Sequence, residues 1–194
     1  MKIFLIRHGQ TTGDVEDRYG GAYDDHLTDV GIEQSRELAK KLENMGIEKI
    51  FVSPLFRAQE TAVIVRDALN CELEIVQDLR ERNNYGILTG MRKTEAMSKH
   101  PNVVPKLKHH VHDIPNSESY DDFKKRILAK FEELVNKNLE VIAIVTHGGP
   151  ISCIFRELLG HNKIKISDCG FVELQSDGGR TCKIIKMVGI AVRE

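Results

Sequence analysis

The sequence predicts an α/β fold, in which helices cover both faces of a mainly parallel sheet in three doubly wound layers. Four short runs rich in isoleucine, valine and phenylalanine are typical of buried strands, and segments of helical period separate them. Two later runs flank a turn and predict an antiparallel edge near the C-terminus. Right-handed crossovers in such folds place ligand sites at the carboxyl ends of the strands.

Composition favours one ordinary globular domain spanning residues 1–194. The 28 lysines and arginines nearly balance the 29 aspartates and glutamates, which gives a net charge of -1. The balanced charge does not favour binding to nucleic acid or to an anionic membrane. No apolar stretch has the roughly 20 residues of a membrane span. We therefore expect a cytoplasmic protein without nucleic-acid or membrane partners. The pattern predicts no oligomeric state.

The expected strands cover residues 3–6, 50–52, 73–76 and 141–145. The expected hairpin pairs residues 171–174 with 182–188 around the sequence SDGGR. The four cysteines have no CxxC spacing and are expected to be free thiols.

Four helices are expected between these strands. Thr28 caps the first, and Gly46 is its expected stop. The second begins near Arg57. Ser119 and Asp122 predict a capping box for the third, whose apolar face extends to residue 135, and residues 149–159 form the fourth.

Residues 82–117 are irregular and hold three of the five prolines, so we expect an inserted lid or rim. A basic cluster lies within this segment and comprises Lys106, Lys108, His109, His110 and His112. It suggests recognition of an anionic distal group on a ligand. A solvated rim is an equally good interpretation, and histidine metal binding is a weaker one.

Two histidines occupy equivalent places in the predicted sheet. His8 follows the first strand and His147 follows the fourth, each before a glycine that allows close approach to the backbone. Arg7 and Arg57 add cations at the same end. A metal site would not gather cations around its ligands, whereas guanidinium groups match phosphate oxygens. The set predicts an anion site, although each residue alone also fits a structural role.

Glu81 follows the third predicted strand in the sequence Leu79-Arg80-Glu81-Arg82. Local sequence alone favours an exposed acid paired with a neighbouring arginine. At a phosphoryl-transfer site, however, a carboxyl group here would handle the proton of the leaving oxygen.

Taken together, these motifs resemble the histidine phosphatase superfamily, which has the phosphoglycerate mutase-like fold. The matching blocks follow the family order: Ile6-Arg7-His8-Gly9-Gln10-Thr11, Gly21-Ala22-Tyr23-Asp24, Leu27-Thr28-Asp29-Val30-Gly31, Ser53-Pro54-Leu55-Phe56-Arg57, Leu79-Arg80-Glu81-Arg82, Ser117-Glu118-Ser119 and Thr146-His147-Gly148-Gly149.

The resemblance implies a role for each matching residue. His8 would be the nucleophile that becomes phosphohistidine, Glu81 would be the proton donor and then the base, and Arg7, Arg57 and a protonated His147 would clamp the phosphoryl group. Substrate contacts would come from a wider set, which comprises Gln10, Thr11, Asp14, Gly21, Tyr85, Ser117 and the backbone of Gly148.

Two departures from the family pattern stand out. Asp14 occupies a position where the family usually has a phosphate-contacting asparagine, and its carboxylate would repel an anion unless neutralised. The segment from Arg82 to Gly86 is one residue longer than usual, which implies a local bulge after Glu81.

The expected activity is that of a phosphomonoesterase acting on a small phosphorylated metabolite, with no metal and no cofactor. A cofactor-dependent phosphoglycerate mutase is the alternative, because Glu81-Arg82, Tyr85-Gly86, Leu88, Gly90 and Lys93 look like the mutase version of that block. A second alternative is a phospholigand-binding module that has lost turnover.

Overall fold

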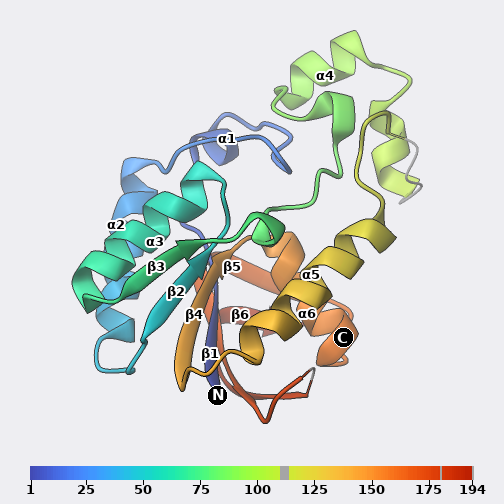
Figure 1. The fold of residues 1–194 in the computed structure, drawn as a ribbon. Coiled ribbons are helices and arrows are strands. Elements are labelled where there is room, and N and C mark those ends of the chain that lie inside the picture. The colour runs from blue at the N-terminus through green and yellow to red at the C-terminus, as the bar shows by residue number, and fades with distance from the viewer. Residues whose placement is uncertain (110–113, 180, 194) are drawn as a thin grey trace.

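A six-stranded sheet forms the centre of the molecule, with strand order β3-β2-β4-β1-β5-β6 (Figure 1). The computed structural model describes residues 1–109, 114–179 and 181–193. The strands are β1 (Lys2–Arg7), β2 (Lys49–Val52), β3 (Glu72–Ile75), β4 (Val141–Thr146), β5 (Ile164–Ser176) and β6 (Cys182–Val192). The four strands from β3 to β1 are parallel, and β5 pairs antiparallel with both β1 and β6.

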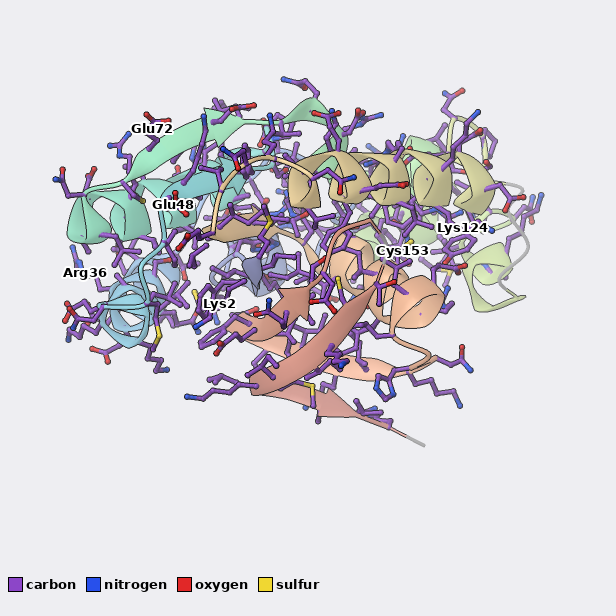
Figure 2. The ribbon with its side chains drawn as sticks, turned by 60° about the horizontal axis from the view of Figure 1, so that its bottom comes forward. Lys2, Arg36, Glu48, Glu72, Lys124 and Cys153 are labelled. Carbon is purple, nitrogen blue, oxygen red and sulfur yellow. The ribbon has the colours of Figure 1, made fainter. Side chains whose placement is uncertain are left out.

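Alternating side chains of β1 face two different helical layers. Ile3 and Leu5 pack against α5 (Tyr120–Val135) and α6 (Gly148–Leu158). Phe4 and Ile6 pack on the other face, against α2 (Asp29–Leu42) and α3 (Phe56–Leu69). Figure 2 shows these layers apart, with Arg36 of α2 and Lys124 of α5 at opposite sides of the molecule. The predicted three-layer α/β architecture is confirmed.

Helix α2 begins where the sequence predicts and ends earlier. The Thr28 side chain accepts a hydrogen bond from the Gly31 N–H and caps the helix. The last helical residue is Leu42, because Glu43 takes extended dihedral angles and Asn44 has a φ of 61°. Gly46, the expected stop, has a φ of 74° and lies in the loop that leads to β2.

Strand β3 differs from its prediction as a buried strand. It pairs with β2 only, and its side chains are partly or fully exposed because it forms the edge of the sheet. Lys49 of β2 bridges to Glu72 and Glu74 of β3, so ion pairs link this edge strand to its neighbour.

The C-terminal hairpin is longer than predicted and carries an irregularity between Ile166 and Phe171. Within it, Cys169 has a φ of 53°, and its N–H donates to the His8 carbonyl. The four cysteines are free.

The predicted insertion holds short helices: η2 (Gly86–Leu88), α4 (Lys93–Lys99) and η3 (Val104–His109). Leu88, Ala96 and Val104 pack together beneath them. This segment lies beyond the carboxyl ends of the parallel strands, on the same side as α1 (Thr12–Val15) (Figure 1). Among the residues described, no helix is long and apolar enough to cross a membrane.

Candidate active site

A cavity of about 690 Å³ lies at the carboxyl ends of β1 and β4. Its volume suits a small ligand. Nine of the predicted site residues line it: Arg7, His8, Thr11, Asp14, Gly21, Arg57, Glu81, Tyr85 and Gly148. His147 lies behind His8, and Gln10 and Ser117 are not among the lining residues.

His8 follows the last residue of β1 and is 5% exposed. Its Nδ1 lies 2.8 Å from the Gly9 carbonyl oxygen, which requires a proton on Nδ1 and leaves a lone pair on Nε2. Arg57 donates its Nε–H to that Nε2 at 3.1 Å. Burial, Arg57 and Arg7 hold the pKa of His8 well below 6.5, so the ring is neutral at neutral pH.

The loop after His8 depends on two glycines. A Cβ at Gly9 would lie 2.6 Å from the Gly31 carbonyl oxygen, and a Cβ at Gly31 would lie 2.1 Å from the Gln10 carbonyl oxygen. The loop therefore rests directly on the first turn of α2, which fixes the backbone beside His8. Gln10 serves this packing as well, since its Oε1 accepts from the Thr28 hydroxyl.

Arg57 lies in the first turn of α3 and is 4% exposed. Besides its bond to His8, it donates to the Tyr23 carbonyl at 2.6 Å, to the Gly21 carbonyl at 3.0 Å and to the Asp25 carboxylate at 2.8 Å. These acceptors come from the loop before α2 and hold the guanidinium in one orientation beside the Nε2 of His8.

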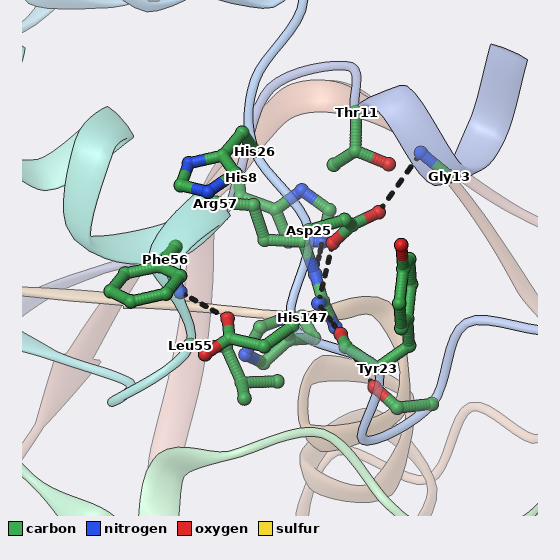
Figure 3. Close-up of polar contacts among 12 residues, drawn as sticks. His8, Thr11, Gly13, Tyr23, Asp25, His26, Leu55, Phe56, Arg57 and His147 are labelled. Atoms are coloured by element: carbon green, nitrogen blue, oxygen red, sulfur yellow. Dashed lines mark hydrogen bonds and ion pairs between the residues drawn. The ribbon is translucent and has the colours of Figure 1, made fainter. Parts of the chain in front are cut away.

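Asp25 is a member of the site that sequence reasoning missed. It is 5% exposed, lines the cavity and accepts from the Gly13 N–H at 3.2 Å as well as from Arg57 (Figure 3). A Cβ at Gly13 would lie 2.4 Å from its Oδ2, so the glycine is what allows this approach. The paired acids Asp24-Asp25 were the only sequence signal, and nothing in it separates the buried member from the exposed one.

His147 caps the start of α6 and is fully buried. Its Nε2 lies 2.6 Å from the Ser53 hydroxyl, and its Nδ1 is buried without a hydrogen-bond partner among the described residues. Its ring meets the edge of His8 at a centroid distance of 5.0 Å. Burial and Arg57 hold its pKa well below 6.5. The ring is therefore neutral in the free site, in contrast to the expected protonated form.

Arg7 is held from the β5 side of the sheet. It donates to the Ile166 carbonyl at 2.7 Å and pairs with Asp168 at 3.1 Å, whereas its Nε is buried without a partner among the described residues. Asp168 sits in the irregular part of β5, and no sequence signal pointed to it.

Glu81 lies on the cavity wall opposite α3, beyond η1 (Gln77–Leu79). Its Oε1 accepts from the Arg82 N–H at 2.8 Å and its Oε2 from the Gly149 N–H at 3.0 Å. Burial raises the pKa of the carboxyl group despite these bonds. The extra residue after Glu81 does not remove it from the site.

The Asp14 side chain is engaged by local hydrogen bonds, and none of the ion pairs among the described residues includes it. Its carboxylate accepts from the N–H and the hydroxyl of Thr11, in a capping box at the start of α1. In the predicted basic cluster, Lys106 is exposed and does not line the cavity. The side chains of Lys108, His109, His110 and His112 lie outside the described residues.

The site presents a neutral imidazole on His8, two arginines held by hydrogen bonds, a carboxyl group of raised pKa on Glu81, and buried nitrogens on Arg7 and His147 that have no partner among the described residues. Unpartnered buried donors are costly and are commonly satisfied by a ligand. Over the described residues, no group of three or more metal-ligating side chains is gathered. The chemistry favoured by this set is the binding of a compact anion.

Comparisons with known proteins agree with this geometry. A Hydrogenobacter thermophilus protein named "Putative phosphoserine phosphatase 2" is 28% identical over 187 residues, covering 93% of this chain and 92% of that one. A Yersinia pestis protein named "Probable phosphoglycerate mutase GpmB" is 31% identical over 185 residues, covering 87% and 82%.

Among solved structures, Bacillus stearothermophilus YhfR superposes with a TM-score of 0.84 at 26% identity, covering 94% of each chain. The model of the histidine phosphatase superfamily (branch 1) matches residues 3–185. The chain therefore belongs to the histidine phosphatase superfamily.

Proposed function

We propose that this protein is a metal-independent phosphomonoesterase that hydrolyses a small phosphorylated metabolite through a phosphohistidine on His8. Membership of the superfamily indicates a phosphatase or a mutase. The observation that supports the finer proposal is the state of His8: its Nδ1–H is held by the Gly9 carbonyl, so its unprotonated nitrogen is Nε2, which accepts the Arg57 Nε–H in the free site and would turn its lone pair to phosphorus.

In the first half-reaction, His8 Nε2 attacks phosphorus while the bond from phosphorus to the ester oxygen breaks. The leaving oxygen takes a proton from Glu81, and burial shifts the pKa of this carboxyl group upward, in the direction that favours the proton-donating form. In the second, water attacks phosphohistidine, Glu81 takes the proton of that water, and His8 is released with inorganic phosphate.

The charge of the transferring group is met by fixed donors. Arg57 contacts His8 directly, Arg7 lines the cavity with a buried Nε that has no partner among the described residues, and His147 packs against His8. With the Ser53 hydroxyl donating to its Nε2, His147 carries its proton on Nδ1, and we assign these three groups to the phosphoryl oxygens. Two arginines beside the nucleophile also disfavour a resident divalent cation.

The substrate-binding roles of Thr11, Gly21, Tyr85 and the Gly148 backbone agree with their places on the cavity wall. We also propose that residues 82–117 act as a lid or rim of a single domain, because their helices stand beyond the strand ends.

The test is hydrolysis of p-nitrophenyl phosphate in the presence of EDTA, comparing wild type with His8→Ala. Turnover that resists EDTA and falls by at least about 10³-fold in the variant supports the proposal. Full activity of the variant contradicts it.

A mutase is the second candidate, because one relative carries that name. It would transfer phosphate between phosphoglycerates faster than to water. Tight binding of phosphate esters with neither reaction would instead indicate a binding module.

A further inference from the structure

The cavity extends past the phosphoryl site along one face of α6. Gly149, Ser152, Cys153 and Arg156 all line it and recur at helical spacing. Seven residues of helix separate Gly149 from Arg156, a rise of about 10 Å. Arg156 is therefore the lining residue of α6 that lies farthest along the helix from the phosphoryl site.

Tyr120 closes this distal part of the cavity from α5. The guanidinium carbon of Arg156 lies 5.3 Å from the centre of its ring, and that of Arg82 lies 5.6 Å from it. The Tyr120 hydroxyl donates to Glu157 at 2.8 Å, and burial together with this bond raises its pKa, so the phenol stays neutral. Two guanidinium groups thus share one neutral aromatic platform at the cavity wall.

Basic side chains outnumber acidic ones around the cavity, and most of the basic side chains form an ion pair with an acidic residue. Four such pairs are Arg7 with Asp168, Arg57 with Asp25, Arg18 with Glu16, and Lys93 with Asp17. Arg156, although it lines the same cavity, forms no ion pair within the described parts of the chain. Arg156 is an exposed residue of the cavity wall, so its charge is open to a ligand and has no ion-pair partner among those residues.

We propose that Arg156, with Arg82 and the Tyr120 ring beside it, binds a carboxylate at the distal end of the substrate. The preferred substrate is then a short phosphoester of a carboxylic acid. The assignment rests on the proposed function for the phosphoryl end. A carboxylate fits better than a second phosphate, because Arg156 supplies one uncompensated charge and a planar fork that matches two carboxylate oxygens.

The test measures binding rather than turnover. Two compounds that cannot be hydrolysed, 4-phosphonobutanoate and 4-hydroxybutylphosphonate, differ only by a carboxylate in place of a hydroxymethyl group. Calorimetry gives the dissociation constant of each for wild type, Arg156→Gln and Lys124→Gln. Lys124 is the matched control: it also lies over the Tyr120 ring, at 5.7 Å, but does not line the cavity (Figure 2 shows it on α5, with Cys153 of α6 nearby).

Wild type is expected to prefer the carboxylate compound by at least about tenfold, the contribution of one charge-assisted contact. Arg156→Gln should lose that preference, Arg156→Glu should reverse it, and Lys124→Gln should keep it. Equal binding of the two compounds by wild type, an unchanged preference in Arg156→Gln, or no binding of either compound overturns the proposal.

A wild-type preference for a bisphosphonate of the same length over 4-phosphonobutanoate would overturn the choice of carboxylate. Because none of these compounds is turned over, failure here is separate from failure of the phosphatase assay.

Discussion

At the scale of single residues, we expect substitution within the Asp25–Arg57 ion pair to have the largest effect on stability and activity. Both side chains are 5% exposed, and removing one partner of a buried ion pair leaves the other uncompensated. Asp25→Asn should lower the free energy of unfolding by about 3 kcal/mol and lower kcat/KM by at least about tenfold, as Arg57 loses its orientation. Urea unfolding and phosphatase kinetics measure both.

The control for that variant is Asp24→Asn. Asp24 is exposed and accepts from the Phe56 N–H at the start of α3, so it is adjacent in sequence without touching Arg57. Equal kinetic effects of the two substitutions would contradict the role given to Asp25.

His147 leads to a prediction about stability and pH. Its folded-state pKa is depressed well below 6.5, so the unfolded chain binds more protons than the folded one as pH falls below that value. The stabilisation is present above pH 6.5 and is lost on acidification. In His147→Asn, the dependence of unfolding free energy on pH should therefore be shallower by about one proton between pH 6.5 and 5.

Urea unfolding at several pH values measures this slope. Because the pKa of Glu81 is raised, its contribution to stability changes with pH in the opposite direction and is lost as pH rises. Glu81 is present in both proteins, so this contribution cancels when their slopes are compared. Parallel slopes would show that His147 is not buried in its neutral form.

Sequence could predict the proposed catalytic residues because His8 and His147 directly follow strands, and Arg7, Arg57 and Glu81 lie in motifs near the ends of strands. Asp25 and Asp168 could not be predicted from sequence, because their roles depend on ion pairs with Arg57 and Arg7 that form only in the folded chain. Likewise, the charge state of His147 depends on three arginines and a histidine that lie far from it in sequence.

At the scale of elements, the first turn of α6 positions Glu81, the residue that we propose as the proton donor. A Cβ at Gly149 would lie 2.0 Å from the Glu81 Oε1. Gly149→Ala should displace the carboxyl group and lower kcat for p-nitrophenyl phosphate by at least about tenfold, in the range typical of impaired acid–base catalysis. Steady-state kinetics checks it.

Gly148→Ala controls for stability in that experiment. A Cβ there meets no atom within 4 Å, so alanine at this position should gain the usual helical advantage of about 0.5–1 kcal/mol over glycine. Wild-type kcat in Gly149→Ala would contradict the assigned position of Glu81.

The starts of helices were predictable where a capping residue in the sequence is also the N-cap in the folded chain. The Thr28 and Ser119 caps begin α2 and α5 as expected. The end of α2 was not predictable, since the chain leaves the helix before its glycine. The exposure of β3 was not predictable either, because the local sequence of a strand does not determine whether it lies at the edge or the centre of the sheet.

At the scale of the whole molecule, ligand binding should be linked to global stability, since the site draws on β1, α3, β4 and β5. Inorganic phosphate at about 100 times its Kd should stabilise the fold by about 2.7 kcal/mol. For a chain of this size, that corresponds to a rise in Tm of about 5–10 °C. The rise should vanish in Arg7→Gln, as scanning calorimetry can measure.

The pairing of β1 also bears on the order in which the protein can be built. Lys2 pairs with Val141 on one side and with Gln175 on the other. During translation, this apolar strand leaves the ribosome among the first residues but waits for partners made much later. His8, which follows this strand and which we propose as the nucleophile, is thus synthesised early but reaches its site only after β4 and β5 have been made. The unpaired strand is exposed to aggregation throughout that interval.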